Sequence, residues 1–393
     1  MATMDSSRMK AAQDQARAAA AKGPASAPAD GRARTRHVAI GDPQAPFDTF
    51  LRVLDVHGLL GDDGRLKPEV ALVSMGDHFD WGGPADRARA AESGLHLLAW
   101  LAAHPEDQIV ILLGNHDLGR VCELADFDDA AFAQAQREAD AIYLDEDYDE
   151  EDDATEARFL EKYPRIPNAE LVSRDFGTFT AAQRDWVTHL LRVRRFRAAH
   201  AHGEDLLLCH AGVTREDLAG VGVPPERQHR APEVAAALNA RVDDLVSRWT
   251  GGYLDLGALH KPGYAHHPGG RGIFYQRPAH PAVHLRKTDF DGPPRRRYDP
   301  HHLPEGLLQG IGHIRDNKCR LLLGSWAKAE EAKDGPLRHL RVREGNVSYA
   351  RGLPGDVSPR DATMLFLDSA MNHVPPESYE LLDLDTRTVL PKR

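Results

Sequence analysis

The amino-acid sequence predicts an α/β protein in which two packed mixed β-sheets are flanked by helices. Three apolar runs, at residues 37–42, 69–77 and 107–117, have the near-continuous hydrophobicity of strands that are buried on both faces. Apolar residues recur every three or four positions at 47–60 and 85–104, which indicates helices between these strands. Strands that alternate with helices are typical of a layered fold around a buried sheet.

The second half of the chain supplies strands for a second sheet. Residues 204–213 and 306–316 are apolar runs that end at histidines, and residues 232–249 between them have the periodicity of an amphipathic helix. The remaining expected elements are a hairpin with a Glu-Gly-Asn turn at 337–351 and strands at 363–368 and 379–390.

We expect one domain with a tail and two insertions. Residues 1–35 are rich in Ala, Pro and Gly and lack a continuous apolar stretch, which predicts a disordered N-terminal tail and not a signal peptide. Residues 36–393 form the domain. Insertions are expected near 139–160, where acidic residues are concentrated, and near 251–304, where Gly, Pro and His are frequent. Because the histidines of the second insertion lack regular ligand spacing, we expect solvated loops there.

Composition and charge argue against several classes of function. The 393 residues carry a net charge of −11, which disfavours binding to nucleic acid or to an anionic membrane surface. No segment has the length and hydrophobicity of a membrane span. Cys122, Cys209 and Cys319 are odd in number and far apart, so we expect no disulfide framework, a reducing compartment and a cytoplasmic protein.

Polar residues follow the predicted strands at the points where these strands end. Asp42, Asp77 and Asn115, each preceded by glycine, close the first three strands. Because ligand sites in α/β folds lie beyond the carboxyl ends of the strands, these side chains should converge on one crevice. Carboxylate, amide and imidazole donors together suit Mn, Fe, Zn or Mg. Such a set can hold two cations that share one carboxylate.

Five short motifs stand in order along the chain, namely "GDPQ" (41–44), "GDHFD" (76–80), "GNHD" (114–117), "CHAG" (209–212) and "GIGHIR" (310–315). This order resembles that of the calcineurin-like metallophosphoesterases. The phrases "LLGNHDLGR" and "LLCHAGV" are most similar to the branch that contains the phosphoprotein phosphatases, the Shewanella-like phosphatases and the bacterial diadenosine tetraphosphate hydrolases. The resemblance implies the two-sheet sandwich of this superfamily.

The resemblance also implies a site for two divalent metal ions. We expect Mn²⁺, with Fe, Zn or Mg as alternatives. The implied ligands are Asp77, which would bridge both ions, Asp42 and Gln44 for the first site, and Asn115, His210 and His313 for the second.

By the same resemblance, His116 would be the general acid that protonates the leaving oxygen, and Asp80 would hold its imidazole. A carboxylate partner raises the pKa of a histidine and fixes its orientation, which suits proton donation near neutral pH. The implied reaction is hydrolysis of a phosphomonoester, on a protein or a small molecule, by attack of a metal-bound hydroxide on phosphorus. Two alternatives stay open: a nucleotide pyrophosphate or dinucleoside polyphosphate hydrolase of the same fold, and a catalytically silent binding or scaffold protein.

Three positions depart from the family pattern. Gln44 stands where a histidine is usual, as it does in the manganese-dependent ADP-ribose and CDP-alcohol pyrophosphatases, and Arg315 stands where many members have a further histidine. Trp81 replaces the arginine that binds phosphate in the phosphoprotein phosphatases. We therefore expect substrate phosphate to meet Arg277 or Arg120, and Trp81 to stack on a flat ring of the substrate. The alternative is that these residues and Gln44 are ordinary packing or surface residues.

Overall fold

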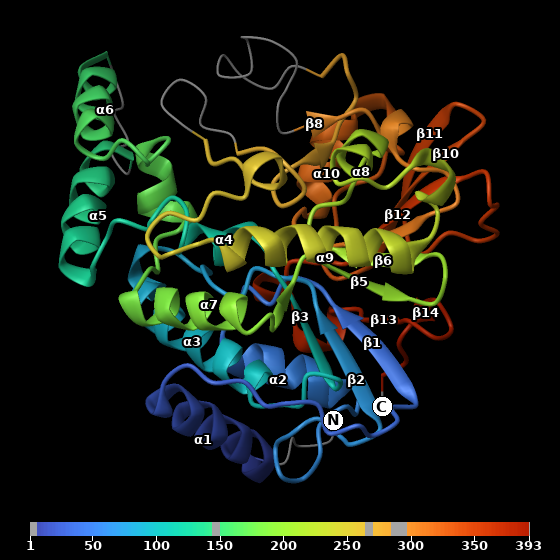
Figure 1. Ribbon diagram of the computed structural model, residues 1–393, viewed down its shortest axis with the longest axis horizontal. Helices are drawn as coiled ribbons and strands as arrows, with labels where there is room; N and C mark the ends of the chain where they lie inside the picture. Colours follow the sequence, from blue (N-terminus) through green and yellow to red (C-terminus); the bar gives the residue numbers. More distant parts are fainter. Residues whose placement is uncertain (1–5, 144–149, 264–269, 284–296, 393) are drawn as a thin grey trace.

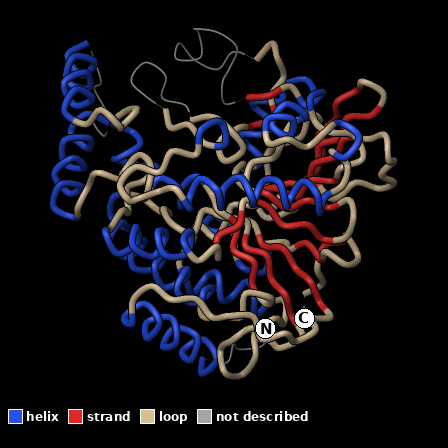
Figure 2. Tube along the Cα trace, viewed as in Figure 1, coloured by secondary structure: helices blue, strands red, loops and turns tan. Residues whose placement is uncertain are grey.

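The structure is a computed structural model that describes residues 6–143, 150–263, 270–283 and 297–392. Within these residues, two six-stranded sheets lie at the centre of the molecule, and a separate pair of short strands lies beside the second sheet (Figure 1). Figure 2 shows helices along the outer side of the first sheet and longer loops around the second. The predicted fold of two mixed sheets flanked by helices is confirmed.

The first sheet contains the predicted alternation of strands and helices. The strand order is β14-β13-β1-β2-β3-β4, and the strands from β1 to β4 are parallel, whereas β13 is antiparallel to β1. The strands are β1 (Arg36–Ile40), β2 (Val70–Ser74), β3 (Ile109–Leu112), β4 (Phe196–Arg197), β13 (Leu382–Asp383) and β14 (Thr388–Val389).

The second sheet has the order β11-β10-β12-β9-β6-β5. Its three central strands, β6, β9 and β12, are parallel, and the outer strands are antiparallel to their neighbours. The predicted hairpin is confirmed as β10 and β11. The strands are β5 (Ala199–His202), β6 (Leu206–Cys209), β9 (Leu308–Ile311), β10 (Arg338–Arg343), β11 (Asn346–Arg351) and β12 (Ala362–Phe366).

Apolar side chains from both sheets form one layer between them. Val73 and Leu112 of the first sheet share a buried cluster with Leu208 and Leu365 of the second. A second, larger core contains side chains of the helices and of both sheets, and within it Phe50 meets Trp100 edge to face. Burial on both faces explains why the first-sheet strands are apolar almost throughout. The helices of the framework are α2 (Phe47–Val56), α3 (Arg87–Ala102), α7 (Ala181–Arg192) and α9 (Ala231–Ser247).

The N-terminal segment is ordered, so the predicted disordered tail is wrong for residues 6–35. Helix α1 (Ser6–Lys22) packs against α2 and α3 and buries Met9, Ala12 and Ala16. Alanine has high helix propensity and a small side chain, so the alanine-rich segment can fold and lie close to its neighbours. The chain that follows α1 is hydrogen-bonded to the domain, for example from Ala27 N to Ala102 O at 2.9 Å.

The first expected insertion forms a helical arm. It consists of α5 (Asp129–Tyr143) and α6 (Glu150–Lys162), and residues 144–149 of the acidic run lie outside the described residues. Beneath the arm is a satellite core, a cluster that is separate from the two cores of the sheets. The satellite core contains Leu124, Phe127, Phe132, Ala135, Ala139, Ile142, Phe159, Ile166, Ala169, Leu171, Val172, Phe176, Phe179 and Tyr275.

The second expected insertion, 251–304, is mostly loop where it is described. It contains the parallel pair β7 (Arg277–Pro278) and β8 (Arg297–Tyr298), and residues 264–269 and 284–296 lie outside the described residues. The remaining short helices are α4 (Asn115–Gly119), α8 (Arg215–Gly220) and α10 (Asp316–Leu323). In the part of the chain that the structure describes, no helix combines the length and the hydrophobicity needed to cross a membrane.

A charge placed under α1 tests whether this helix is docked. Ala16→Asp puts an unpaired carboxylate against α3, and we expect it to lower the free energy of opening of α1 by about 2 kcal/mol or more. Ala18 is exposed on the same helix, so Ala18→Asp is the matched control and carries only the propensity cost, under about 0.7 kcal/mol. Hydrogen exchange of the α1 amides measures both values, and equal exchange in the two variants would contradict docking.

Candidate metal centre and catalytic site

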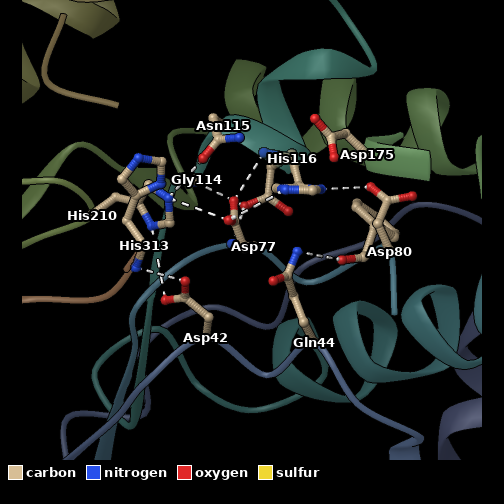
Figure 3. A network of polar contacts seen from close by, with 12 residues as sticks. Asp42, Gln44, Asp77, Asp80, Gly114, Asn115, His116, Asp175, His210 and His313 are labelled. Carbon is tan, nitrogen blue, oxygen red and sulfur yellow. Dashed lines mark hydrogen bonds and ion pairs between the residues drawn. The ribbon is translucent and has the colours of Figure 1, made fainter. Parts of the chain in front are cut away.

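Residues from both sheets meet at the edge where the parallel strands end (Figure 3). This convergence follows from the fold, because parallel strands place their carboxyl ends on one side of a sheet. The structure brings together all six residues predicted as metal ligands, and their function as ligands stays a prediction. They are Asp42 and Gln44 after β1, Asp77 after β2, Asn115 after β3, His210 after β6 and His313 after β9.

Three acceptor atoms face one another at the centre of the group. His210 Nδ1 donates to Met75 O at 2.8 Å, which leaves its Nε2 without a proton in the neutral ring. That Nε2 lies 3.1 Å from Asn115 Oδ1 and 3.4 Å from Asp77 Oδ2. Burial alone would lower the pKa of His210, but the charge of Asp77 outweighs it and raises the pKa. The same negative charge would attract a cation.

His313 and Asp42 are held together by the backbone of the last motif. Asp42 Oδ2 accepts a hydrogen bond from His313 N at 2.6 Å. His313 Nε2 donates to Tyr275 O at 3.0 Å, so its Nδ1 is the nitrogen left for a ligand. Gly312 is required between them, because a Cβ there would lie 1.8 Å from Asp42 Oδ1.

The donors present fit a divalent cation. Asp77, His210 and His313 are all buried and offer ligand atoms within 4.8 Å of one another. Burial and the charges of Asp368 and Asp77 raise the pKa of Asp42 well above its ordinary value. Asp42 Oδ1 is buried and has no hydrogen-bond partner among the described residues. A bound cation would stabilise the ionised form of Asp42 and would give its Oδ1 a partner.

Gln44 has one of its two amide atoms engaged. Its Nε2 donates to Phe79 O at 3.1 Å, which fixes the orientation of the amide. Figure 3 shows the side chain pointing towards Asp77, with the amide oxygen on the side of Asp42. A carbonyl oxygen in this position suits a hard cation.

Three site residues have backbone conformations that are rare for residues other than glycine. Asp77 has φ 56°, Asp80 has φ 65° and His313 has φ 67°. A left-handed conformation at such a residue costs about 1–3 kcal/mol and tends to occur at functional sites. The loops that follow β2 and β9 therefore turn sharply at these residues.

The predicted pair of His116 and Asp80 forms. His116 Nδ1 lies 2.9 Å from Asp80 Oδ2, and His116 N donates to Asp77 Oδ1 at 2.9 Å. With Nδ1 bonded to the carboxylate, Nε2 is the nitrogen that can exchange a proton with a ligand. Burial would lower the pKa of His116, but Asp77 and the hydrogen bond to Asp80 outweigh it and raise the pKa. The ring of Phe176 packs against the imidazole with a centroid distance of 5.1 Å.

Arg120 holds Asp80 and not substrate, so its assignment to substrate phosphate is wrong. Its guanidinium donates to Asp80 at 2.6 and 3.0 Å and is completely buried. Asp80 also accepts hydrogen bonds from Thr178 N and Oγ1. Burial would raise the pKa of Asp80, but Arg120 outweighs it and brings the pKa to about 2. A buried guanidinium whose N–H groups are already hydrogen-bonded cannot reach a ligand in solvent. The position of Arg120 in the sequence does not reveal that its side chain is buried.

A cleft of about 310 Å³ opens beside His116 and Asp42. Trp81 lines it but is only 6% exposed, and the guanidinium of Arg89 covers its ring at 4.7 Å, so little of the ring is available for stacking. Arg277 is not part of this lining, although its charge, after burial, helps to lower the pKa of His313. The arginines that do line the cleft are Arg174 and Arg315.

Sequence reasoning missed two carboxylates. Asp117 accepts hydrogen bonds from the backbone N–H groups of Gly114, Asp77 and His78, so it ties together the loops that follow β2 and β3. His78, which had no predicted role, lies 3.0 Å from Asp117 and is structural. Asp368 follows β12 and lines the cleft. The strand-end rule that identified Asp42 would also have found Asp368.

One of three comparisons with known proteins, a scan against family models, agrees with this geometry. A family model described as calcineurin-like phosphoesterase matches residues 35–249. A search of curated proteins gives no match. Among solved structures, a protein serine/threonine phosphatase from Saccharomyces cerevisiae, with similarity to human phosphatase PP5, aligns with 89% of this chain and 90% of its own at 11% identity and a TM-score of 0.32. That TM-score is too low to support a conclusion, so the family assignment rests on the family model.

Removal of Arg120 tests its role as the counterion of Asp80. Arg120→Met removes the guanidinium partner of a buried carboxylate, and we expect it to lower the free energy of unfolding by about 3–5 kcal/mol. Arg315 pairs with Asp334 at 2.6 Å, and the two side chains are 35% and 23% exposed, so Arg315→Met is the control and should cost about 1 kcal/mol or less.

The stability difference between Arg120→Met and its control should depend on pH in a defined direction. Because Arg120 keeps the pKa of folded Asp80 at about 2, the stabilisation is complete above the ordinary carboxyl pKa of about 4 and is lost as the pH falls towards 2. Urea unfolding of both variants between neutral and acidic pH measures it. If the loss of unfolding free energy in Arg120→Met did not shrink on acidification, the pairing of Arg120 with ionised Asp80 would be contradicted.

Proposed function

The chain belongs to the calcineurin-like phosphoesterase family, and from that membership we propose that it hydrolyses phosphomonoesters with two divalent metal ions, Mn²⁺ foremost. The observation that carries the proposal is the pair His116–Asp80, which lines the cleft and lies next to the buried cluster of Asp77, His210 and His313. A proton donor beside cation ligands is the combination that phosphate ester hydrolysis requires.

The ligand set supports metal binding at two positions. His210, His313 and Asn115 would hold one ion, and Asp42 and Gln44 would hold the other, with Asp77 between them. When bound, such ions supply an activated water molecule and neutralise the charge that develops on the phosphate oxygens. Asp368 lies close enough to Asp42 to raise its pKa, so it is a further candidate for the ion at Asp42.

His116 is suited to give a proton to the leaving oxygen. Asp80 accepts from its Nδ1 and fixes the tautomer, so that Nε2 can carry the proton towards the cleft. Arg120 in turn keeps Asp80 ionised, because it holds the pKa of that carboxyl at about 2. Asp80 and Arg120 thus act through His116 as positioning residues.

The cleft supports a phosphate ester as the substrate. Arg174 and Arg315 line it and could meet phosphate oxygens as bidentate donors, although both now bind carboxylates of the chain. The net charge of −11 disfavours nucleic acid, so a phosphorylated small molecule or a phosphoprotein is the proposed substrate class.

A nucleotide pyrophosphate or dinucleoside polyphosphate is the second candidate substrate, since Gln44 matches the first motif of such hydrolases. The limited exposure of Trp81 weakens this candidate, because a nucleobase would need an open ring face. Faster hydrolysis of bis(p-nitrophenyl) phosphate than of p-nitrophenyl phosphate would favour the diester-like reaction. A catalytically silent scaffold would hydrolyse neither compound.

Metal titration tests the two-ion arrangement. We expect calorimetry of the metal-free protein with Mn²⁺ to resolve two phases of unequal affinity, because the position at Asp42 includes a neutral amide. Gln44→Ala should weaken the Mn²⁺ affinity of one phase by about 10–100-fold, which is the usual effect of losing a residue that supports a metal ligand. Gln44→His should strengthen that phase for Zn²⁺, which imidazole suits better than an amide.

Asn372 supplies the control for that titration, since it is another neutral amide in the lining of the same cleft. Asn372→Ala should leave both phases unchanged. A single phase in the unaltered protein would refute the two-ion proposal, and an unchanged Gln44→Ala titration would remove Gln44 from the ligands.

Leaving-group dependence tests the role of His116. We expect His116→Ala to reduce turnover of an alkyl phosphate by about 10²–10⁴-fold, the usual contribution of general acid catalysis. The loss should be much smaller for p-nitrophenyl phosphate, whose leaving group departs without a proton. Metal content, measured by elemental analysis, should stay the same. An equal loss for both substrates would mean that His116 positions the phosphate and does not protonate the leaving oxygen.

A further inference from the structure

A second group of metal-ligand side chains lies away from the strand ends. Cys122, Glu123 and His260 are buried, and one ligand atom of each lies within 4.8 Å of the others. Cys122 and Glu123 follow α4, whereas His260 belongs to the long loop that precedes β7. The group therefore joins two segments that are far apart in the sequence.

Several polar atoms of this group have no hydrogen-bond partner among the described residues. They are Glu123 Oε2 and both ring nitrogens of His260, in side chains that are no more than 1% exposed. His260 Nε2 lies 3.8 Å from Glu123 Oε2, which is too long for a hydrogen bond. The other carboxylate oxygen, Oε1, accepts from Tyr275 OH at 3.0 Å. Unpartnered atoms at this depth are costly, and they point to a bound group that satisfies them.

The charges of the three side chains indicate which kind of ligand they would bind. Among the described residues, the ion-pair contact of Glu123 is to His260 alone, and no Lys or Arg pairs with it. A divalent cation with one thiolate, one carboxylate and one neutral imidazole forms a group of zero net charge, which can be buried at low cost. Sulfur, nitrogen and oxygen donors in one set are characteristic of Zn²⁺.

We propose that Cys122, Glu123 and His260 supply three ligands to a Zn²⁺ ion, separate from the candidate metal centre at the strand ends. Binding replaces the S–H bond of Cys122 by an S–Zn bond and releases the thiol proton to solvent. The hydrogen bond from Cys122 Sγ to Leu254 O, at 3.3 Å, describes the thiol before the ion binds.

This ion would tie the long loop to the catalytic site. Tyr275 stacks on His260 with a centroid distance of 5.1 Å and donates to Glu123, while its carbonyl accepts from His313 Nε2. The position of His313 therefore depends on a tyrosine that the ion would hold on two sides. The ion would therefore act on the candidate catalytic site only by positioning Tyr275 and His313. Its binding does not depend on the proposed activity.

Cobalt substitution distinguishes this site from the strand-end centre. A thiolate bound to Co²⁺ gives an intense near-ultraviolet charge-transfer band, whereas nitrogen and oxygen ligands alone give none. The candidate ligands at the strand ends contain no sulfur, so the band would report only a cysteine site. We expect the full chain, produced in medium with Co²⁺ in place of Zn²⁺, to show the band.

Variants assign the band to the proposed ligands. Cys122→Ser and His260→Ala should abolish it or shift it, whereas Cys209→Ala and Cys319→Ala should retain it, since these cysteines are also buried but lie outside the group. Absence of the band in the unaltered protein, or its persistence in Cys122→Ser, would overturn the proposal.

X-ray absorption of the zinc-loaded protein gives a test that needs no variant. We expect a sulfur neighbour of zinc at about 2.3 Å, the usual Zn–S distance. A zinc environment of nitrogen and oxygen alone would overturn the proposal, because the group would then hold only water or an ion pair.

Discussion

The structure depends on how a group of buried carboxylates near the strand ends is neutralised. Asp80 is matched by Arg120, and Asp117 accepts from His78 and from three backbone amides. Among the described residues, Asp42 and Asp77 form ion pairs with histidines alone. A buried charge needs a partner, so Asp80 and Asp117 belong to the scaffold of the site, whereas Asp42 and Asp77 are the pair that a bound cation would neutralise.

Most of the framework could be predicted because its strands are buried on both faces. Such strands are apolar throughout, as at 69–77 and 107–117, and each ends in a polar residue that marks the edge of the sheet. The N-terminal helix could not be predicted in the same way. Its buried face consists mainly of alanines, whose pattern is equally compatible with a solvated helix, and only the partner surface on α2 and α3 decides between the two.

Residues of the candidate site could be predicted where they lie at a strand end or within a motif. They could not be predicted where their role depends on residues that are distant in the sequence. Asp42, Asp77 and His116 lie within motifs. Arg120 also follows a motif, yet its side chain turns inward to Asp80, because that carboxylate is buried and Thr178 closes the other side. The cluster of Cys122, Glu123 and His260 is assembled by a long loop, so no spacing in the sequence indicates it.

The satellite core beneath the helical arm affects how the protein would lose activity on heating. This core is separate from the cores of the two sheets, and the arm is tied to the framework by polar contacts such as that of Arg87 with Asp140, so the arm can open as a cooperative unit once these contacts break. Two of its members contact the candidate catalytic site directly: Phe176 packs on His116, and the carbonyl of Tyr275 accepts from His313. Melting of the arm alone would remove one contact from each histidine while the sheets remain folded. Thermal inactivation and global unfolding would then be two different transitions, and inactivation would come first.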